Sequence, residues 1–138
     1  MKDYVIYTDG SCRGNGNGGV GIVWLKDGNK VFEYSKGFKN TTNNKMELMA
    51  IYIALSSIKK EVNSLEIVSD SEYAIGVLTK PWNPKKNKEL IEVIKQKIKL
   101  TQNLVKSPIK WSHTYGHSDN EWNNLCDKLA QFESKNML

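Results

Sequence analysis

Runs of apolar and β-branched residues dominate the first third of the chain and predict strands. Residues 4–8 and 20–25 are rich in valine, isoleucine and aromatic residues, and residues 31–38 begin a third run of this kind. Turn-forming residues separate the runs, and Asp27-Gly28 between the second and the third is a typical hairpin signal. The pattern therefore predicts three consecutive antiparallel strands.

The apolar period then changes to that of a helix. Ala50, Ile51 and Ala54 share one helical face with Glu47, so residues 44–60 are expected to form a long helix. Apolar runs and helical periods follow in the second half of the chain. They predict strands at residues 65–69 and 108–115, and helices at residues 71–78, 89–98 and 120–134. Strands that alternate with helices favour parallel pairing, so we expect an α/β fold built on a mixed sheet.

The length and composition fit a single globular domain at residues 1–138. No apolar run approaches the roughly 18 residues of a membrane-spanning helix, so no membrane partner is expected. The first residues lead directly into a strand, without the pattern of a signal peptide, so a cytoplasmic location is expected. Cys12 and Cys126 are therefore expected to be free thiols.

The charge of the chain suggests a polyanionic partner. Lysines give it a formal net charge of +5, and Arg13 is its only arginine. A basic excess of this size is typical of nucleic-acid binding, although lysine-rich surfaces also serve solubility alone. The net charge alone therefore does not identify the partner, and the sequence motifs are more specific.

Three closely spaced glycines match a dinucleotide-binding loop in spacing alone. Gly14, Gly16 and Gly19 fit the pattern G-x-G-x-x-G, which must open a helix to bind a pyrophosphate. A predicted strand follows here instead. We therefore expect these glycines to connect two strands, at a place where a ligand can approach the backbone closely.

Two acidic residues stand where predicted strands end. Asp9 follows the strand at residues 4–8, and Asp70 follows the strand at residues 65–69. Ligands of open α/β sheets bind beyond the carboxyl ends of strands, so both positions are candidates for a functional site. Each also has a simpler interpretation, because aspartate starts turns and caps helices.

Two further acids lie on predicted helices. Glu47 lies on the apolar face of its helix, although Asn44 and Glu47 also fit a capping box. Asp127 lies one step off the apolar stripe of the last helix and, taken alone, is typical of a solvent-exposed acid.

Four carboxylates at one sheet edge would repel one another unless cations neutralised them, and all-oxygen ligands favour Mg²⁺ or Mn²⁺. Two such ions about 4 Å apart are the usual apparatus of phosphodiester hydrolysis.

Four motifs follow one another along the chain. They are Thr8-Asp9-Gly10-Ser11-Cys12 with Gly14-Asn15, Thr41-Thr42-Asn43-Asn44-Lys45-Met46-Glu47-Leu48-Met49-Ala50, Ser69-Asp70-Ser71 with Tyr73, and Gly116-His117 with Asn123, Cys126-Asp127 and Leu129-Ala130. In these motifs and their spacing the chain resembles type 1 ribonuclease H, over residues 3–132.

This resemblance implies a ribonuclease H-like fold, with a five-stranded mixed sheet in the order 3-2-1-4-5, an antiparallel second strand and helices on both faces. It implies a metal-dependent endonuclease that hydrolyses the RNA strand of RNA–DNA hybrids to 5′-phosphate and 3′-hydroxyl products. Two Mg²⁺ ions, for which Mn²⁺ can substitute, would be bound by Asp9, Glu47, Asp70 and Asp127. His117 would transfer a proton or assist product release, because histidine titrates near neutral pH.

The resemblance also implies a set of substrate contacts. The family recognises RNA by its 2′-hydroxyl groups across a shallow minor groove. The residues that match these contacts are Cys12, Asn15, Asn43, Asn44 and Glu72. Thr42 and Asn87 match a pocket for a DNA phosphate, and Trp82 matches an aromatic side chain that lies on the DNA sugars. Ser71 and Asn123, in the third and fourth motifs, complete the expected set.

Two departures from the family pattern affect substrate binding. Position 72 is commonly glutamine, and a carboxylate at Glu72 can accept a hydrogen bond from a 2′-hydroxyl but cannot donate one. Many members also carry a basic helical handle, and only residues 79–86 fill its place here. Weak binding of the hybrid is therefore expected.

Two other functions are compatible with parts of the sequence. A DNA nuclease or resolvase of the same broad fold would also use clustered acids, but the residues that match 2′-hydroxyl contacts argue against it. A non-catalytic nucleic-acid-binding module is disfavoured because all four acids are present. The expected protein is a monomeric enzyme.

Overall fold

The computed structural model describes residues 1–114 and 120–137. Within these ranges five strands form one sheet, and they are β1 (Asp3–Cys12), β2 (Gly18–Lys26), β3 (Asn29–Phe38), β4 (Ser64–Ser69) and β5 (Lys110–His113). The helices of the same ranges are α1 (Asn43–Ser56), α2 (Glu72–Thr79), α3 (Lys88–Gln102) and α4 (Glu121–Lys135).

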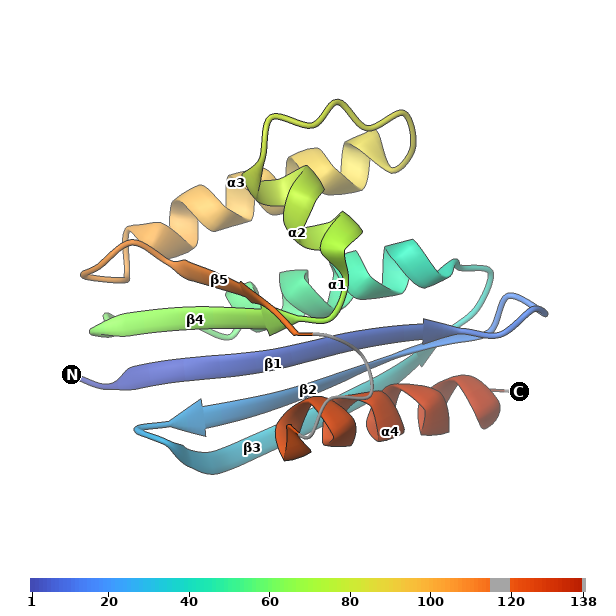
Figure 1. The fold of residues 1–138 in the computed structure, drawn as a ribbon, viewed down its shortest axis with the longest axis horizontal. Coiled ribbons are helices and arrows are strands. Elements are labelled where there is room, and N and C mark those ends of the chain that lie inside the picture. The colour runs from blue at the N-terminus through green and yellow to red at the C-terminus, as the bar shows by residue number, and fades with distance from the viewer. Residues whose placement is uncertain (115–119, 138) are drawn as a thin grey trace.

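The strand order is β3-β2-β1-β4-β5, which confirms the expected sheet (Figure 1). β2 pairs antiparallel with both β1 and β3, whereas β4 pairs parallel with both β1 and β5. The predicted hairpin between β2 and β3 is also present, with positive φ angles of 50° at Asp27 and 85° at Gly28.

Helices cover both faces of the sheet (Figure 1). α1 packs on one face, together with α2 and α3, over the larger apolar core. α4 packs on the other face, where Cys126 lies in a smaller core with Val23 and Leu25. The Cys126 thiol donates a hydrogen bond to the Tyr7 carbonyl at 3.2 Å, and burial raises its pKa well above the ordinary value of a thiol. No helix in the described part of the chain is both long and apolar enough to cross a bilayer.

Several element ends differ from those expected from periodicity. β1 ends at Cys12 rather than at residue 8. Its pairing with β4 stops at Thr8, but its pairing with β2 continues to Cys12 and extends the strand. α1 ends at Ser56 rather than near residue 60, and Ser57 beyond it accepts a hydrogen bond from the Trp24 indole at 2.8 Å. Long-range partners in the sheet thus determine both ends.

β5 starts later than predicted, at Lys110 rather than at residue 108. Pro108 has no N–H to donate to a neighbouring strand. The Ile109 N–H donates to the side-chain oxygen of Gln102 at 2.9 Å, at the end of α3. The sheet pairing therefore begins only at Lys110, opposite Glu66.

Glycines let the two main helices lie directly against the sheet. A Cβ atom at Gly10 would overlap the α1 backbone at Met46 and Glu47. On the other face, a Cβ atom at Gly21 would overlap the Cys126 carbonyl oxygen, and it would lie 2.9 Å from the Leu129 Cβ. Any side chain at these positions would displace a helix.

We expect Gly21→Ala to lower the free energy of unfolding by about 1–3 kcal/mol, the usual cost of overpacking a core. The added methyl group must push α4 away from β2, because its nearest neighbour is backbone rather than a flexible side chain. Urea denaturation of the purified variants measures the effect. Gly14→Ala is the matched control, since no atom lies within 4 Å of a Cβ there; an equal loss in both variants would contradict the close-packing argument.

Candidate active site

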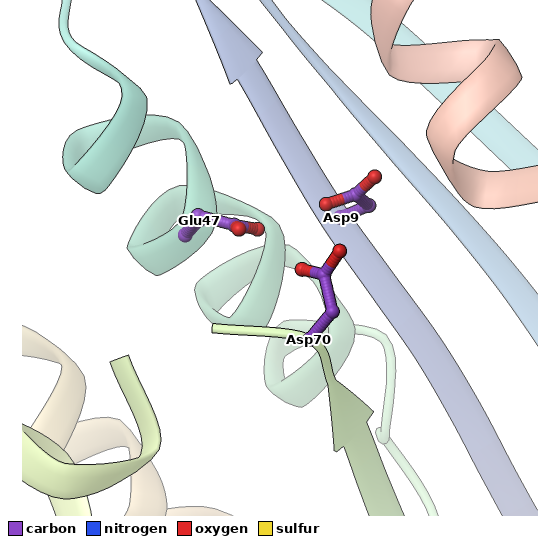
Figure 2. Close-up of side chains that lie close together, drawn as sticks. All are labelled: Asp9, Glu47 and Asp70. Carbon is purple, nitrogen blue, oxygen red and sulfur yellow. The ribbon is translucent and has the colours of Figure 1, made fainter. Parts of the chain in front are cut away.

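Three carboxylates meet where β4 ends beside β1. Asp9, Glu47 and Asp70 each offer an oxygen atom, and these atoms lie within 4.8 Å of one another (Figure 2). Thr8 and Ser69 are paired in the parallel ladder, which places the next residue of each strand at the same edge. The expected convergence of the two aspartates is therefore present, and the α1 residue Glu47 reaches the same point.

The N–H of Gly10 connects two of these acids. It donates to Glu47 Oε1 at 2.7 Å and to Asp9 Oδ1 at 2.9 Å. Glu47 is only 6% exposed, and the cap of α1 is Thr42, whose hydroxyl accepts from the Lys45 N–H at 3.2 Å. The capping-box interpretation of Glu47 is therefore wrong, and its carboxylate belongs to the acidic cluster.

Asp70 also has no capping role. Ser71 caps α2 by accepting from the Ala74 N–H at 3.0 Å, so Asp70 is left to point at the other two acids (Figure 2). Its Oδ1 is buried and has no hydrogen-bond partner within the described residues. A buried oxygen normally has a partner, and a cation bound by the three carboxylates would supply one.

Asp127 reaches this site from α4 but is not among the three most closely grouped acids. It is half-buried, and both of its oxygens lie 3.1 Å from the Gln131 side-chain nitrogen, which donates to them. A hydrogen bond with Asp127, and its charge, contribute to the raised pKa of Asp9. Asp127 is thus adjacent to Asp9, on the side of the cluster that faces α4.

The cluster binds protons tightly when no cation is present. Burial, followed by the charge of Asp70, raises the pKa of Asp9 to about 9. Burial and the charges of Asp9 and Asp70 also raise the pKa of Glu47 well above the ordinary value of a carboxyl group. A hard divalent cation favours oxygen ligands and would offset the repulsion, so this donor set fits Mg²⁺ or Mn²⁺.

Three residues expected to contact the DNA strand line one cleft. Thr42 at the start of α1, and Trp82 and Asn87 in the connection from α2 to α3, border a cavity of about 760 Å³. The Trp82 side chain packs over Gly76 and remains 42% exposed. Asn87 has a left-handed φ of 62°, and its side chain donates to the Tyr73 hydroxyl at 3.2 Å. Segments distant in sequence thus form one continuous surface beside the acids.

The residues expected to contact RNA are more widely distributed. Asn43 and Asn44 are exposed in the first turn of α1, and Asn44 also lines the cleft of Trp82. Cys12 and Asn15 lie at and after the end of β1 and border a different cleft next to α4. These four residues therefore flank the acidic cluster on two sides.

The remaining predicted residues differ in exposure. Glu72 is exposed in the first turn of α2, in a small cavity shared with Lys80 and His113. Asn123 is only 3% exposed, and its side-chain oxygen accepts from the Thr114 hydroxyl at 3.1 Å. His117 lies outside the described residues.

Sequence reasoning missed three residues that position the acids. Gly10 bridges Asp9 and Glu47 through its N–H, and His113 Nε2 lies 3.1 Å from the Asp70 carbonyl oxygen. Gln131 supports Asp127 from one helical turn away. Only the last contact had a signal in the sequence, because side chains four residues apart on a helix are neighbours.

A five-stranded mixed sheet of this order, with a carboxylate cluster where its central parallel strands meet, defines a ribonuclease H-like α/β protein. The family model described as RNase H matches residues 1–135. The chain belongs to the ribonuclease H family.

Individual relatives agree with this assignment. The chain is 45% identical to a ribonuclease H of Clostridium botulinum, over 94% of each chain. It is 41% identical to a ribonuclease H of Acetivibrio thermocellus, over 98% of this chain and 97% of the relative. Among solved structures it is similar to LC11-RNase H1 in complex with an RNA/DNA hybrid, with a TM-score of 0.77 and 25% identity over 96% of this chain and 97% of that one.

We expect the metal-free protein to lose stability as the pH rises from about 4 to about 9. The pKa of Asp9 is about 9 in the folded protein, whereas that of an unfolded aspartate is about 4. Between these values the folded state binds more protons than the unfolded state, so the free energy of unfolding falls with increasing pH. Urea denaturation at pH 5 and pH 8 in a chelator measures this fall.

Two comparisons test the source of this pH dependence. Asp9→Asn should flatten it, whereas Glu61→Gln, at an exposed position outside the cluster, should leave it unchanged. Added Mg²⁺ should stabilise the wild-type protein more at pH 8 than at pH 5, because protons compete with the cation at low pH. Equal stability of the metal-free wild type at both pH values would contradict the buried-cluster argument.

Proposed function

We propose that this protein is a metal-dependent endonuclease that hydrolyses the RNA strand of RNA–DNA hybrids, leaving 5′-phosphate and 3′-hydroxyl ends. The observation that carries this function is the group of Asp9, Glu47 and Asp70, with an unpartnered oxygen on Asp70. Membership of the ribonuclease H family and the similarity to a ribonuclease H1 bound to an RNA/DNA hybrid support this substrate.

The metal centre in this proposal holds two Mg²⁺ ions, for which Mn²⁺ can substitute. Asp9, Glu47, Asp70 and Asp127 would bind them. When bound, such ions would supply the activation of a water molecule for attack on the scissile phosphate and the stabilisation of the departing 3′ oxygen. The three grouped carboxylates and the adjacent Asp127 supply an all-oxygen donor set for this purpose.

The protein's own residues fix the geometry of the reaction. The Gly10 N–H holds one oxygen of Asp9 and one of Glu47, which leaves their other oxygens for a cation. From the α4 side, the Gln131 side chain donates to both oxygens of Asp127 and so fixes the orientation of this carboxylate. His117, which follows β5 and precedes α4 in the sequence, would transfer a proton or assist the release of product.

The two strands of the hybrid would contact different sides of the acidic cluster. The cleft of Thr42, Trp82 and Asn87 suits the DNA strand, with Trp82 against its sugars and the other two residues on a phosphate. The residues proposed to recognise RNA through its 2′-hydroxyl groups are Cys12, Asn15, Asn43, Asn44 and Glu72, with Ser71 and Asn123 as supporting contacts.

The connection from α2 to α3 limits the affinity for the hybrid. It contains only eight residues, 80–87, without a helix, and Pro81 and Pro84 prevent a continuous helix through it. Its lysines therefore cannot extend along the duplex as a basic helical handle would. We infer weak binding with a shallow dependence on salt, because each phosphate contact contributes nearly one unit to the salt slope.

Three broader expectations remain predictions alongside this function. They are that residues 1–138 form one domain, that the protein is a monomer, and that it works in the cytoplasm. Gel filtration coupled to light scattering tests the second of these directly.

The defining experiment is Mg²⁺-dependent cleavage of a labelled RNA–DNA hybrid, with duplex DNA of the same sequence as the control substrate. The wild type should cleave only the RNA strand of the hybrid. Asp70→Asn should lose cleavage by several orders of magnitude and keep its fold, because the change removes a ligand charge without changing the side-chain volume. Near wild-type turnover in this variant, or equal cleavage of duplex DNA, would rule out the proposal.

Glu72→Gln should bind the hybrid modestly more tightly than the wild type. The exposed carboxylate of Glu72 repels phosphates and cannot donate to a 2′-hydroxyl, whereas glutamine is neutral and can donate. Equilibrium binding of a fluorescent hybrid measures the change, and Glu61→Gln controls for the loss of one negative charge. Weaker binding by Glu72→Gln would mean that the substrate requires an acceptor at this position.

A further inference from the structure

A second polar cleft lies next to the acidic cluster, on the side of α4. Its volume is about 440 Å³, and it lies between the loop that follows β1 and the last turns of α4. Figure 1 shows that this loop and the C-terminal end of α4 lie at the same end of the molecule. Ser11, Arg13 and Asn15 line it from the loop, and Gln131 and Lys135 line it from the helix.

The charges in this cleft have one sign. Arg13 and Lys135 carry positive charges, and no acidic residue among those the structure describes borders the cleft. Both side chains are exposed, and neither forms an ion pair with any residue in the described part of the chain. The remaining lining groups are hydroxyls, amides and a thiol, which can donate hydrogen bonds to an anion.

The backbone that carries Arg13 is held in a closed turn. The Arg13 N–H donates to the Asn17 carbonyl at 2.9 Å, and the Gly16 N–H donates to the Arg13 carbonyl at 3.0 Å. The Asn17 N–H also donates to the Asn15 side chain at 3.0 Å. These bonds fix the backbone at Arg13 before any ligand arrives, while the exposed side chain is left to reach an anion. Arginine is unique here among 20 basic residues, and its planar guanidinium suits a phosphate better than an ammonium group does.

The cleft lies close to the acidic residues. Gln131 borders it and also holds Asp127, while Arg13 follows Asp9 by only four residues at the end of β1. An extended strand covers at most roughly 13 Å over four residues. Each strand of a duplex advances about 3.4 Å per phosphate along the axis. A phosphate at Arg13 would therefore lie within about four nucleotides of the scissile phosphate.

The position of the cleft also indicates which strand it contacts. The cleft of Thr42, Trp82 and Asn87 is built from α1 and the α2–α3 connection, on the other face of the sheet from α4. That cleft is assigned above to the DNA strand. The strand that passes through the acidic cluster toward α4 is then the cleaved one.

We infer that Arg13, assisted by Lys135, binds a backbone phosphate of the RNA strand within a few nucleotides of the cleavage site. This inference rests on the proposed function and adds a specific anion subsite to it. The subsite compensates in part for the absent basic handle, because it supplies a charged contact close to the reaction rather than far along the duplex. It acts in substrate binding and not in the chemical step.

The first test compares Arg13→Ala with the control variant Lys106→Ala. Lys106 is exposed and lies near the starts of β1 and β4, whereas the acidic cluster lies at the end of β4, so the control removes one positive charge away from the site. Arg13→Ala should raise KM for the hybrid about three- to tenfold and leave kcat within about twofold, since the contact is made equally in the ground and transition states. It should also lower the slope of log affinity against log salt by about one. Lys106→Ala should change neither quantity.

Further variants separate charge from geometry. Arg13→Lys should keep the salt slope of the wild type but bind less tightly than it, because lysine lacks the bidentate fork. Lys135→Ala should weaken binding less than Arg13→Ala does. Circular dichroism and the melting temperature should match those of the wild type in every variant, because both side chains are exposed. Identical salt slopes in Arg13→Ala, Lys106→Ala and the wild type would overturn the inference.

The second test locates the phosphate. Hybrids carry a single neutral methylphosphonate linkage, placed in turn at each position of the RNA strand or the DNA strand. At one position of the RNA strand near the cleavage site, the neutral linkage should weaken binding of the hybrid to the wild type and leave its binding to Arg13→Ala unchanged. If that position lies in the DNA strand, or if none depends on Arg13, the inference is wrong. A wild type that binds hybrids without cleaving them would instead refute the proposed function, and both binding tests would still decide the subsite.

Discussion

Direct backbone contact between the sheet and its two main helices is the constraint on which the rest of this structure depends. Gly10 allows α1 to lie against one face of β1, and Gly19 and Gly21 allow α4 to lie against the other face of β2. The helices carry Glu47 and Asp127 respectively, so the same close packing brings both acids to Asp9. A cluster assembled from four separate elements requires that each element be placed to within a fraction of an ångström.

This packing buries the carboxyl groups of Asp9 and Glu47, where their ionised forms are unfavourable. The raised pKa values of Asp9 and Glu47 show that the protein alone does not stabilise their ionised forms. The Gly10 N–H offsets only part of the repulsion, because one donor serves two carboxylates. The fold therefore tolerates a locally unstable site, and the rest of the core must supply the stability that the site removes. A bound divalent cation would remove this conflict.

The strand order came from the resemblance to type 1 ribonuclease H, and the structure confirms it. The residues themselves were sufficient for Asp9 and Asp70, because apolar runs end next to both acids and parallel strands end at one edge. It was ambiguous for Glu47, whose deciding partner, Gly10, lies 37 residues away. The ends of β1, α1 and β5 were predicted less well, since neighbouring strands and the side chains of Trp24 and Gln102 determine them. No periodicity could show that Thr42, Trp82 and Asn87 share a cleft, because the start of α1 and the α2–α3 connection, which are distant in sequence, must pack before it exists.

The two cysteines of the chain lie in opposite chemical environments, and this has a practical consequence. Cys126 is fully buried beneath Gly21, with a thiol that resists ionisation and is hydrogen-bonded to a strand carbonyl. Thiolates are the species that react with maleimides and oxidants, so Cys126 is protected from both while the fold persists. Cys12 is half-exposed beside the cleft of Arg13. A fluorescent dye added to the native protein would therefore attach at a single site in the cleft of Arg13, with no need to remove the other cysteine.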